Sequence, residues 1–316
     1  MTKVIFFGTA DFAIPALEAL LGEPDRFDVV AVVSRPDKPA GRKGDIAVAP
    51  VAQLARARKL TLFQPTKLKD DVFYDSLDVL KPDLLVVASY GRIIPQRILD
   101  LAKVAPLNLH GSLLPKYRGA SPIQTAILEG ESITGTSLMV MDAEIDHGPV
   151  LAMAETPIAL DDTHASLERK LGVDAARLLI ENLELFMGGE IKAVPQNHQA
   201  ATFTKILSRE DGLIDWHAED ASRIECKTRA YHPWPGAYFV WNRAGKPLRI
   251  KVLSARVIQN LGNILPGTCF KSQSGNPAIS TANNAVELLL VQPEGKKSMP
   301  GSALLNGYRD IIDTIL

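Results

Sequence analysis

Residues Lys3 to Gly22 read KVIFFGTADFAIPALEALLG and set the pattern that the first half of the chain repeats. The run KVIFFG is rich in aromatic and β-branched residues and closes at Gly8, as a short buried strand does. DFAIPALEALLG then places apolar residues at helical spacing and stops at Gly22. A strand followed at once by a helix predicts an α/β domain.

The alternation of strand and helix continues as far as residue 111. Strand-like runs are DVVAVVS (28–34), DLLVVASYG (83–91) and PLNLHG (106–111), and helix-like runs are PVAQLARARK (50–59) and PQRILDLA (95–102). Apolar strands separated by helices predict a mostly parallel sheet that is covered by helices on both faces.

The texture changes after this region. Residues 136–156 predict a hairpin around an acidic turn, and a long helix from Thr163 to Met187 follows, with Leu167, Leu171, Leu178, Leu179 and Phe186 near one face. Beyond it, one helix (220–231) and strands at 236–241, 248–258, 267–270 and 285–293 favour a small β-barrel. We therefore expect a domain at 1–188, a linker at 189–206 and a second domain at 207–316.

Composition limits the classes of function. The net charge of the 316 residues is −1, so any nucleic-acid partner must be held by a local basic surface. Residues 207–316 carry 13 Lys and Arg against 10 Asp and Glu, whereas residues 1–206 carry 22 against 26. This small excess fits a merely solvated surface or a surface that faces RNA.

Cysteine and hydropathy patterns predict a cytoplasmic protein. Cys226 and Cys269 form no CxxC pair and suggest no disulfide framework. The first apolar run is too short for a signal peptide, and no apolar run approaches the roughly 20 residues that span a bilayer.

The stretch NLHGSLLPKYRGASPIQ, Asn108 to Gln124, carries the clearest chemical signal. Side chains alternate along a strand, so Asn108 and His110 point to the same side. They stand at the carboxyl end of a predicted parallel strand, where such sheets bind ligands. An amide can stabilise a developing oxyanion, and an imidazole can move protons near neutral pH. The alternative is that both side chains only satisfy loop backbone.

Two further stretches are candidates for a site. MDAEIDHGP brings Asp142, Glu144 and Asp146 into one turn, where one carboxylate could orient His110. RPDKPAGRKGDIAVAP, Arg35 to Pro50, is a basic connection longer than the usual 2–6 residues and could hold a phosphate-rich partner. Solvated loops are the alternative for both. GTADF lacks the GxGxxG pattern, which argues against a nicotinamide or flavin cofactor.

Together these stretches resemble the methionyl-tRNA formyltransferases. The resemblance covers nearly the whole chain and includes GTADF, RPDKPAGR, FQP, VVASYGRIIP, NLHGSLLPKYRGASPIQ, MDAEIDHGP, RAYHPWPGAY and VQPEGKK. The NxHxSLLPxxRG core is shared with the wider 10-formyltetrahydrofolate-dependent transferases, and the motifs after residue 230 point to the tRNA enzymes.

The resemblance implies a Rossmann-like domain followed by an OB-type barrel. It also implies transfer of a formyl group from 10-formyltetrahydrofolate to the α-amine of methionine on initiator tRNA, for translation initiation, by a monomer without metal or membrane. Its catalytic residues fall on Asn108, His110 and Asp146. The folate-contacting positions fall on Tyr90, Gly91, Arg92, Ile93, Ser112, Leu113, Leu114, Pro115 and Asp142. We expect tRNA contacts from Arg35, Lys38, Gly41, Arg42, Lys43, Lys227, Arg229, Lys296 and Lys297.

Two departures from the family pattern and three alternatives remain. Ala10 stands where many members have proline, and DHGP replaces DTGD, so that His147 adds a titratable group beside Asp146. The alternative functions are formyl transfer to a nucleotide-linked amino sugar, hydrolysis of the formyl group by water, and RNA binding without catalysis.

Overall fold

The computed structural model describes residues 1–40, 45–260 and 264–316, and the chain forms two compact units. The first unit contains Met1–Pro122, Ile133–Pro157 and Leu167–Lys205. The second contains Ile123–Ser132, Ile158–Ser166 and Ile206–Leu316. The expected borders at 188 and 206 remain a prediction.

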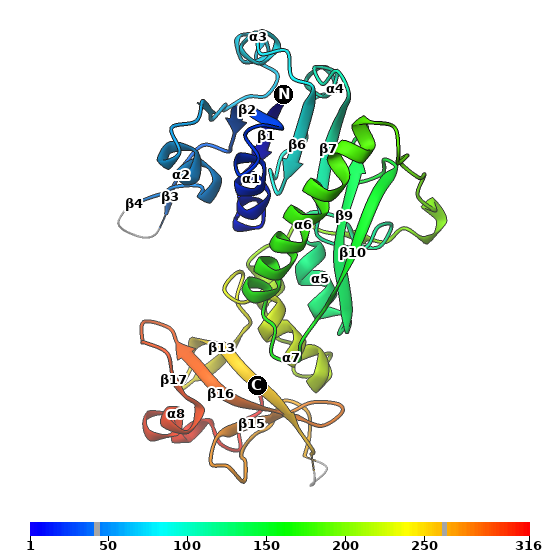
Figure 1. Ribbon diagram of the computed structural model, residues 1–316. Coiled ribbons are helices and arrows are strands. Elements are labelled where there is room, and N and C mark those ends of the chain that lie inside the picture. The colour runs from blue at the N-terminus through cyan, green and yellow to red at the C-terminus, as the bar shows by residue number, and fades with distance from the viewer. Residues whose placement is uncertain (41–44, 261–263) are drawn as a thin grey trace. The chain divides into compact units, whose positions relative to one another are not determined.

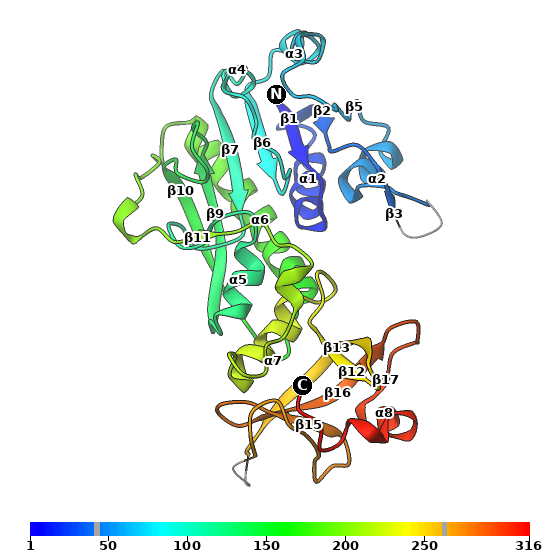
Figure 2. The ribbon, with the colours of Figure 1, turned by 180° about the vertical axis from the view of Figure 1, so that it is seen from behind.

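A seven-stranded sheet forms the centre of the first unit (Figures 1 and 2). Its strand order is β10-β9-β7-β6-β1-β2-β5. The pairs among β5, β2, β1, β6 and β7 are parallel, and β9 and β10 add an antiparallel hairpin. The bounds are β1 Thr2–Gly8, β2 Phe27–Val33, β5 Leu62–Phe63, β6 Leu84–Ala88, β7 Ala105–His110, β9 Ile133–Val140 and β10 Val150–Pro157. The predicted α/β sheet and hairpin are confirmed.

Helices pack against both faces of this sheet. Ile5 and Phe7 of β1 pack with Phe73 and Leu77 of α3 and Ile98 of α4. On the opposite face, α1 and α6 lie over the strands in both views (Figures 1 and 2). The bounds are α1 Ile14–Leu21, α2 Pro50–Ala57, α3 Asp71–Asp78, α4 Gln96–Leu99 and α6 His164–Met187. Helix α5 (Pro122–Leu128) belongs almost entirely to the second unit.

The long helix α6 ends at the predicted residue, Met187, and begins one residue after the predicted start. It buries Leu167, Leu171, Leu178 and Leu179, as the helical spacing of these residues predicts.

Short elements were harder to predict. Helix α3 is not among the elements predicted from the sequence, and it begins where the Asp70 carboxylate accepts a hydrogen bond from the Val72 N–H. The basic connection contains two short strands, β3 (Lys38–Ala40) and β4 (Asp45–Ala47), which pair antiparallel. In the segment interpreted as a linker, β11 (Phe203–Thr204) pairs with β8 (Arg118–Gly119).

The second unit is built on an antiparallel sheet of order β12-β13-β16-β15-β14, with β17 paired to β16. Helix α7 (Ala221–Ala230) packs against β13, and α8 (Gly301–Gly307) follows β17. The strand bounds are β12 Tyr238–Arg243, β13 Lys246–Ile258, β14 Cys269–Lys271, β15 Pro277–Ser280, β16 Ala285–Pro293 and β17 Met299–Pro300. The β-rich module is confirmed, and its closure into an OB-type barrel remains a prediction.

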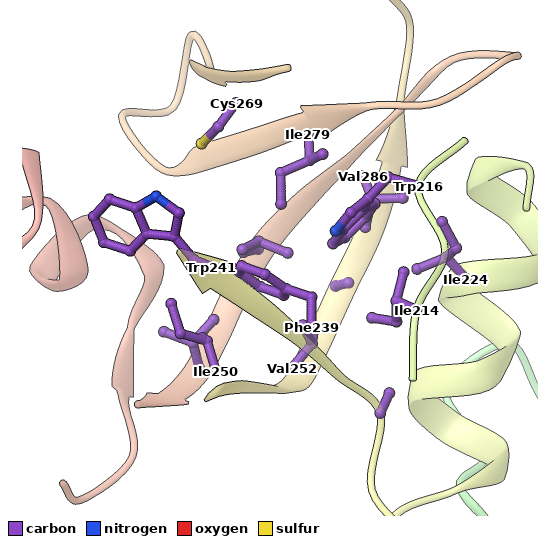
Figure 3. Packing of buried hydrophobic residues seen from close by; sticks show 14 of the residues in the cluster. Ile214, Trp216, Ile224, Phe239, Trp241, Ile250, Val252, Cys269, Ile279 and Val286 are labelled. Atoms are coloured by element: carbon purple, nitrogen blue, oxygen red, sulfur yellow. The ribbon is translucent and has the colours of Figure 1, made fainter. Parts of the chain in front are cut away.

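An apolar core fills the space between this sheet and α7 (Figure 3). Trp216 stacks edge-on against Phe239, with ring centroids 5.5 Å apart. Trp216 and Trp241 are buried in this core, whereas Trp234 is 50% exposed. Among the described residues, no helix combines the length and apolar character that crossing a membrane requires.

Candidate active site

The site is built at the carboxyl end of β7, where Asn108 and His110 are both buried. β7 lies between the parallel strand β6 and the antiparallel strand β9, with Asn108 opposite Met139 and His110 opposite Ser137. The sheet therefore holds both polar side chains rigidly at the edge where we expected a ligand.

Asp146 is the acid of the β9–β10 turn that reaches this pair. Its Oδ1 accepts a hydrogen bond from Asn108 Nδ2 at 3.2 Å, and its Oδ2 lies 3.6 Å from His110 Nδ1. Its side chain is 15% exposed, whereas Glu144 is exposed on the same turn. The three residues assigned to catalysis by resemblance are thus neighbours.

Two hydrogen-bond acceptors flank the His110 ring. Nε2 lies 3.0 Å from the Tyr117 carbonyl oxygen, which can only accept a hydrogen bond. Nδ1 faces the Asp146 carboxylate, which is also an acceptor. Nε2 therefore donates to the Tyr117 carbonyl oxygen, whereas the 3.6 Å between Nδ1 and Asp146 is longer than a hydrogen bond.

Backbone conformation brings Asp146 into place. Asp146 has φ 48°, a left-handed conformation that aspartate tolerates better than most residues. Its Oδ2 also accepts a hydrogen bond from the Gly119 N–H at 2.8 Å. Gly119 has φ 109°, and a Cβ there would lie 2.8 Å from the Thr204 carbonyl oxygen. Only glycine therefore lets this N–H reach the carboxylate.

The expected folate-contacting turn, Ser112 to Pro115, follows β7 directly. Ser112 Oγ donates to the Lys116 carbonyl oxygen at 2.6 Å. Ser137 of β9 donates from Oγ to the Ser112 carbonyl oxygen at 2.7 Å and accepts from the Leu114 N–H at 3.0 Å. Leu114 is buried, and a Cβ at Gly135 would lie 2.5 Å from Leu113 Cδ2. The turn is thereby attached to the sheet beside His110.

The segment after β6 presents different surfaces. Tyr90 is buried, and burial raises the pKa of its hydroxyl to about 12. Gly91 adopts φ 74° beside the Arg35 guanidinium, and Arg92 donates to the Pro65 carbonyl oxygen at 2.9 Å. Ile93 is 76% exposed. It lines an open groove together with Lys69, Ile94, Pro95, Gln96, Arg97 and Ala143.

Asp142 immediately precedes Ala143, which lines the groove, and among the described residues it makes no hydrogen bond to Asp146 or to the donors that bind Asp146. Its Oδ2 lies 2.7 Å from His147 Nδ1, and its Oδ1 accepts from the Glu144 N–H at 2.9 Å. The His147 ring in turn stacks on His198, with centroids 4.1 Å apart and planes at 6°. His147 of DHGP therefore contacts Asp142, which the family resemblance places among the folate-contacting residues.

The residues expected to contact tRNA differ in solvent exposure and in the hydrogen bonds that they already make. Gly41, Arg42 and Lys43 lie outside the described residues, and Lys38 begins β3. Lys296 and Lys297 are exposed.

Two of the expected cations are engaged within the second unit. Lys227 is buried, and its ammonium donates to the Glu219 carboxylate at 2.6 Å and to the Leu213 carbonyl oxygen at 2.9 Å. Arg229 donates to Glu225 at 2.7 Å and to the Asp162 carbonyl oxygen at 3.1 Å. A phosphate contact by Lys227 would require these bonds to break, so its role on tRNA remains a prediction.

Sequence reasoning missed three groups that hold the Asp146 turn. These are the Gly119 N–H, the buried guanidinium of Arg118 and the side-chain amide of Gln196. Arg118 and Gly119 lie inside the motif that was singled out. Gln196 lies in a segment without periodicity, where no local pattern distinguishes it.

Two protein-family models match the chain along most of its length. The model described as Formyl transferase matches residues 2–183, and the model described as Formyl transferase, C-terminal domain matches residues 206–309. A methionyl-tRNA formyltransferase from Roseiflexus sp. (strain RS-1) is 41% identical over 308 residues, 97% of this chain and 93% of its own. One from Chloroflexus aurantiacus (strain ATCC 29366 / DSM 635 / J-10-fl) is 42% identical over 306 residues, 96% of each chain. The chain belongs to the methionyl-tRNA formyltransferase family.

Solved structures share the fold of this methionyl-tRNA formyltransferase family member. A variant of HypX from Aquifex aeolicus has a TM-score of 0.65 at 20% identity, covering 98% of this chain, which spans 48% of HypX. An N-formyltransferase from Helicobacter canadensis, solved with folinic acid and dTDP-3-aminofucose, has a TM-score of 0.66 at 18% identity over 91% of this chain and 99% of its own. At these identities the likeness concerns fold alone.

Proposed function

We propose that Asn108, His110 and Asp146 transfer the formyl group of 10-formyltetrahydrofolate to the α-amine of methionine on initiator tRNA. The observation that carries this proposal is the Asp146 carboxylate itself. It accepts from Asn108 and lies 3.6 Å from His110 at the end of β7. A carboxylate, an amide and an imidazole then face one sheet edge.

The chemistry needs a donor for the formyl oxygen and an acceptor for the amine proton. As the amine nitrogen bonds to the formyl carbon, negative charge grows on the formyl oxygen. Asn108 and protonated His110 stabilise it, and one such donor contributes about 3 kcal/mol. Asp146 accepts the amine proton directly or through water. The bond from the formyl carbon to the folate nitrogen then breaks, and that nitrogen takes up a proton.

Two features support the placement of the folate. The Ser112 to Pro115 turn follows β7 just after His110, and Ile93, in the segment after β6, lines an open groove together with Ala143. A HypX structure that shares this fold was solved in complex with tetrahydrofolic acid. The pterin side of the folate would lie near the turn and Asp142, with Tyr90 to Ile93 along its path.

The relatives' name supports methionyl-tRNA as acceptor, since they match both units at about 40% identity. The exposed Lys296 and Lys297, with Arg35 and the segment from Lys38 to Lys43, are the cations that we assign to tRNA. The enzyme would act in translation initiation as a cytoplasmic monomer without a metal. The competing acceptor is a nucleotide-linked amino sugar, the ligand class of the Helicobacter canadensis structure.

An acceptor comparison tests this function. The protein is mixed with 10-formyltetrahydrofolate and with methionyl-initiator tRNA, dTDP-3-aminofucose or buffer, and the release of tetrahydrofolate is followed. We expect release only with the tRNA, together with formylmethionyl-tRNA. Release with the sugar or with buffer would keep the catalytic cluster and overturn the assigned acceptor.

A further inference from the structure

We propose that Gln196 is a positioning residue for Asp146, although it lies 50 residues further along the chain. It stands between α6 and β11, in the segment that the sequence presents as a linker. The inference rests on the proposed role of Asp146 and adds a residue that acts through it. The structure assigns this role on the contacts of one side-chain amide.

The Gln196 amide bridges the backbone on both sides of His147. Its Nε2 donates to the Asp146 carbonyl oxygen at 2.9 Å and to the Gly148 carbonyl oxygen at 2.7 Å. Asp146 adopts a left-handed φ of 48°, which costs conformational energy unless its surroundings fix it. Two hydrogen bonds from one amide supply that constraint.

The orientation of this amide is fixed by charge. Its Oε1 accepts from Arg118 Nη2 at 2.6 Å and from Arg118 Nε at 3.2 Å. A guanidinium can only donate, so the oxygen must face Arg118 and the NH₂ group must face the two carbonyls. Gln196 and Arg118 are 8% and 3% exposed, so water competes little for these bonds.

The same short segment holds Asp146 from two sides. Arg118 orients the amide that binds the Asp146 backbone, and the next residue, Gly119, donates its N–H to the Asp146 carboxylate. Arg118 Nη2 also lies 3.0 Å from His198 Nδ1, which must accept because the guanidinium only donates. His198 stacks on His147, so the linker contacts the turn at a second point.

A small displacement of Asp146 would therefore follow from losing the Gln196 donors. Misplacing a catalytic group by about 1 Å can cost about 10²-fold in rate. Gln196→Glu keeps the acceptor for Arg118 and replaces the NH₂ donor with an oxygen that faces two carbonyls. Gln199→Glu is the matched control, because it makes the same change three residues away on an exposed side chain.

The first test measures single-turnover formyl transfer at saturating concentrations of both substrates. Rates are expressed per tetrahydrofolate-binding site counted by titration, so that misfolded protein does not contribute. We expect Gln196→Glu to lose roughly 10- to 100-fold in rate with tetrahydrofolate affinity within about twofold, while Gln199→Glu is unchanged. A rate for Gln196→Glu within about twofold of wild type would overturn the proposal.

A double-mutant cycle separates positioning from general structural damage. If Gln196 acts through Asp146, then adding Gln196→Glu to Asp146→Asn should cost less than about twofold further. An equal loss in both backgrounds would sink the idea. Gln196→Asn, which adds no charge but is too short to reach both carbonyls, repeats the test if the glutamate variant folds poorly.

Failure of this inference is distinct from failure of the proposed function. The acceptor is established with wild-type protein alone, and the Gln196 comparison then uses whichever acceptor the wild type accepts. Normal rates in the Gln196 variants would leave formyl transfer intact and remove only the positioning role.

Discussion

Asp146 in the first unit and Glu287 in the second are both held by several hydrogen-bond donors, and the two sets of donors differ in what else they can bind. Glu287 of β16 is fully buried and accepts from the Ser272, Ser274 and Arg256 side chains and from Asn276. Burial alone would raise its pKa, but these hydrogen bonds outweigh it and lower the pKa to about 2. The Glu287 carboxylate is therefore ionised at neutral pH, and its oxygens are occupied by donors from its own unit.

Asp146 is held by fewer partners, and they lie at a sheet edge. It accepts from Asn108 and from the Gly119 N–H, and His110 lies 3.6 Å away. Asn108 and His110 are also the donors that the proposed function assigns to the formyl oxygen. If the proposed function holds, Glu287 stabilises the fold because its donors bind only the carboxylate, and Asp146 acts in catalysis because its donors also bind substrate.

The largest expected effect is a loss of kcat when Asn108 or His110, the side chains beside Asp146, is removed. Asn108→Ala removes one donor for the formyl oxygen, which should lower kcat by about 10²- to 10³-fold. His110→Ala should lower it by about 10²- to 10⁴-fold. Steady-state kinetics with methionyl-tRNA measures both, and urea unfolding checks that each variant is folded. Near-normal rates in the two variants would contradict the assignment.

Substitution of Glu287 should have the opposite effect, lowering the free energy of unfolding and leaving kcat unchanged. Lowering the pKa of Glu287 from 4.5 to about 2 corresponds to about 3 kcal/mol of unfolding free energy, which Glu287→Gln should lose at pH 7. In the wild type this contribution is full above about pH 4.5 and is lost as the pH falls to about 2, and the variant should be flatter in that window.

Tryptophan fluorescence follows unfolding of the second unit selectively, because Trp216, Trp234 and Trp241 all lie in that unit. Urea unfolding of both proteins between pH 2 and pH 7 gives the two curves. Parallel curves would mean that Glu287 carries no depressed pKa. A loss of kcat per folded molecule would mean that it has a catalytic role.

A smaller effect distinguishes the engaged cation from the exposed ones. Lys227→Met removes the partner of the largely buried Glu219 carboxylate, so we expect about 2 kcal/mol of destabilisation. Because the ammonium already binds Glu219, tRNA affinity should be nearly unchanged at equal folded concentration. Stable Lys227→Met protein with weakened tRNA binding would support the predicted tRNA contact of Lys227.

The smallest effect is expected at the exposed lysines. Lys296→Ala and Lys297→Ala should leave stability and folate affinity unchanged and weaken tRNA binding a few-fold. If each lysine contacts a phosphate, each substitution should reduce the slope of log Kd against log salt by about 1. Fluorescence anisotropy with labelled methionyl-tRNA at several salt concentrations measures the slope, and an unchanged slope would remove that lysine from the interface.

Regular patterns explain what the sequence could predict. Apolar runs at strand and helix spacing predicted the parallel sheet, the β9–β10 hairpin and α6, because burial on both faces leaves a long periodic record. Strand alternation placed Asn108 and His110 together without any structure. β5 has only two residues, which is too short a segment to show any periodicity.

Contacts between distant segments explain what the sequence could not predict. Three acids share the β9–β10 turn, and the residues alone left open which one reaches His110; the family resemblance selected Asp146. Gln196 meets Asp146 across 50 residues, and Glu287 meets donors from a loop outside β16. Lys227 lies in a helix rich in cations, where charge counts cannot separate a buried pair from an exposed phosphate contact.

The most direct measurement compares Asp146→Asn with Glu144→Gln in a single turnover of labelled formyl group onto methionyl-initiator tRNA. Both variants neutralise one acid of the same turn, and only Asp146 reaches Asn108. The account predicts a loss of at least about 10²-fold for Asp146→Asn and an unchanged rate for Glu144→Gln. Equal rates in the two variants would contradict the claim that the shared carboxylate performs the chemistry.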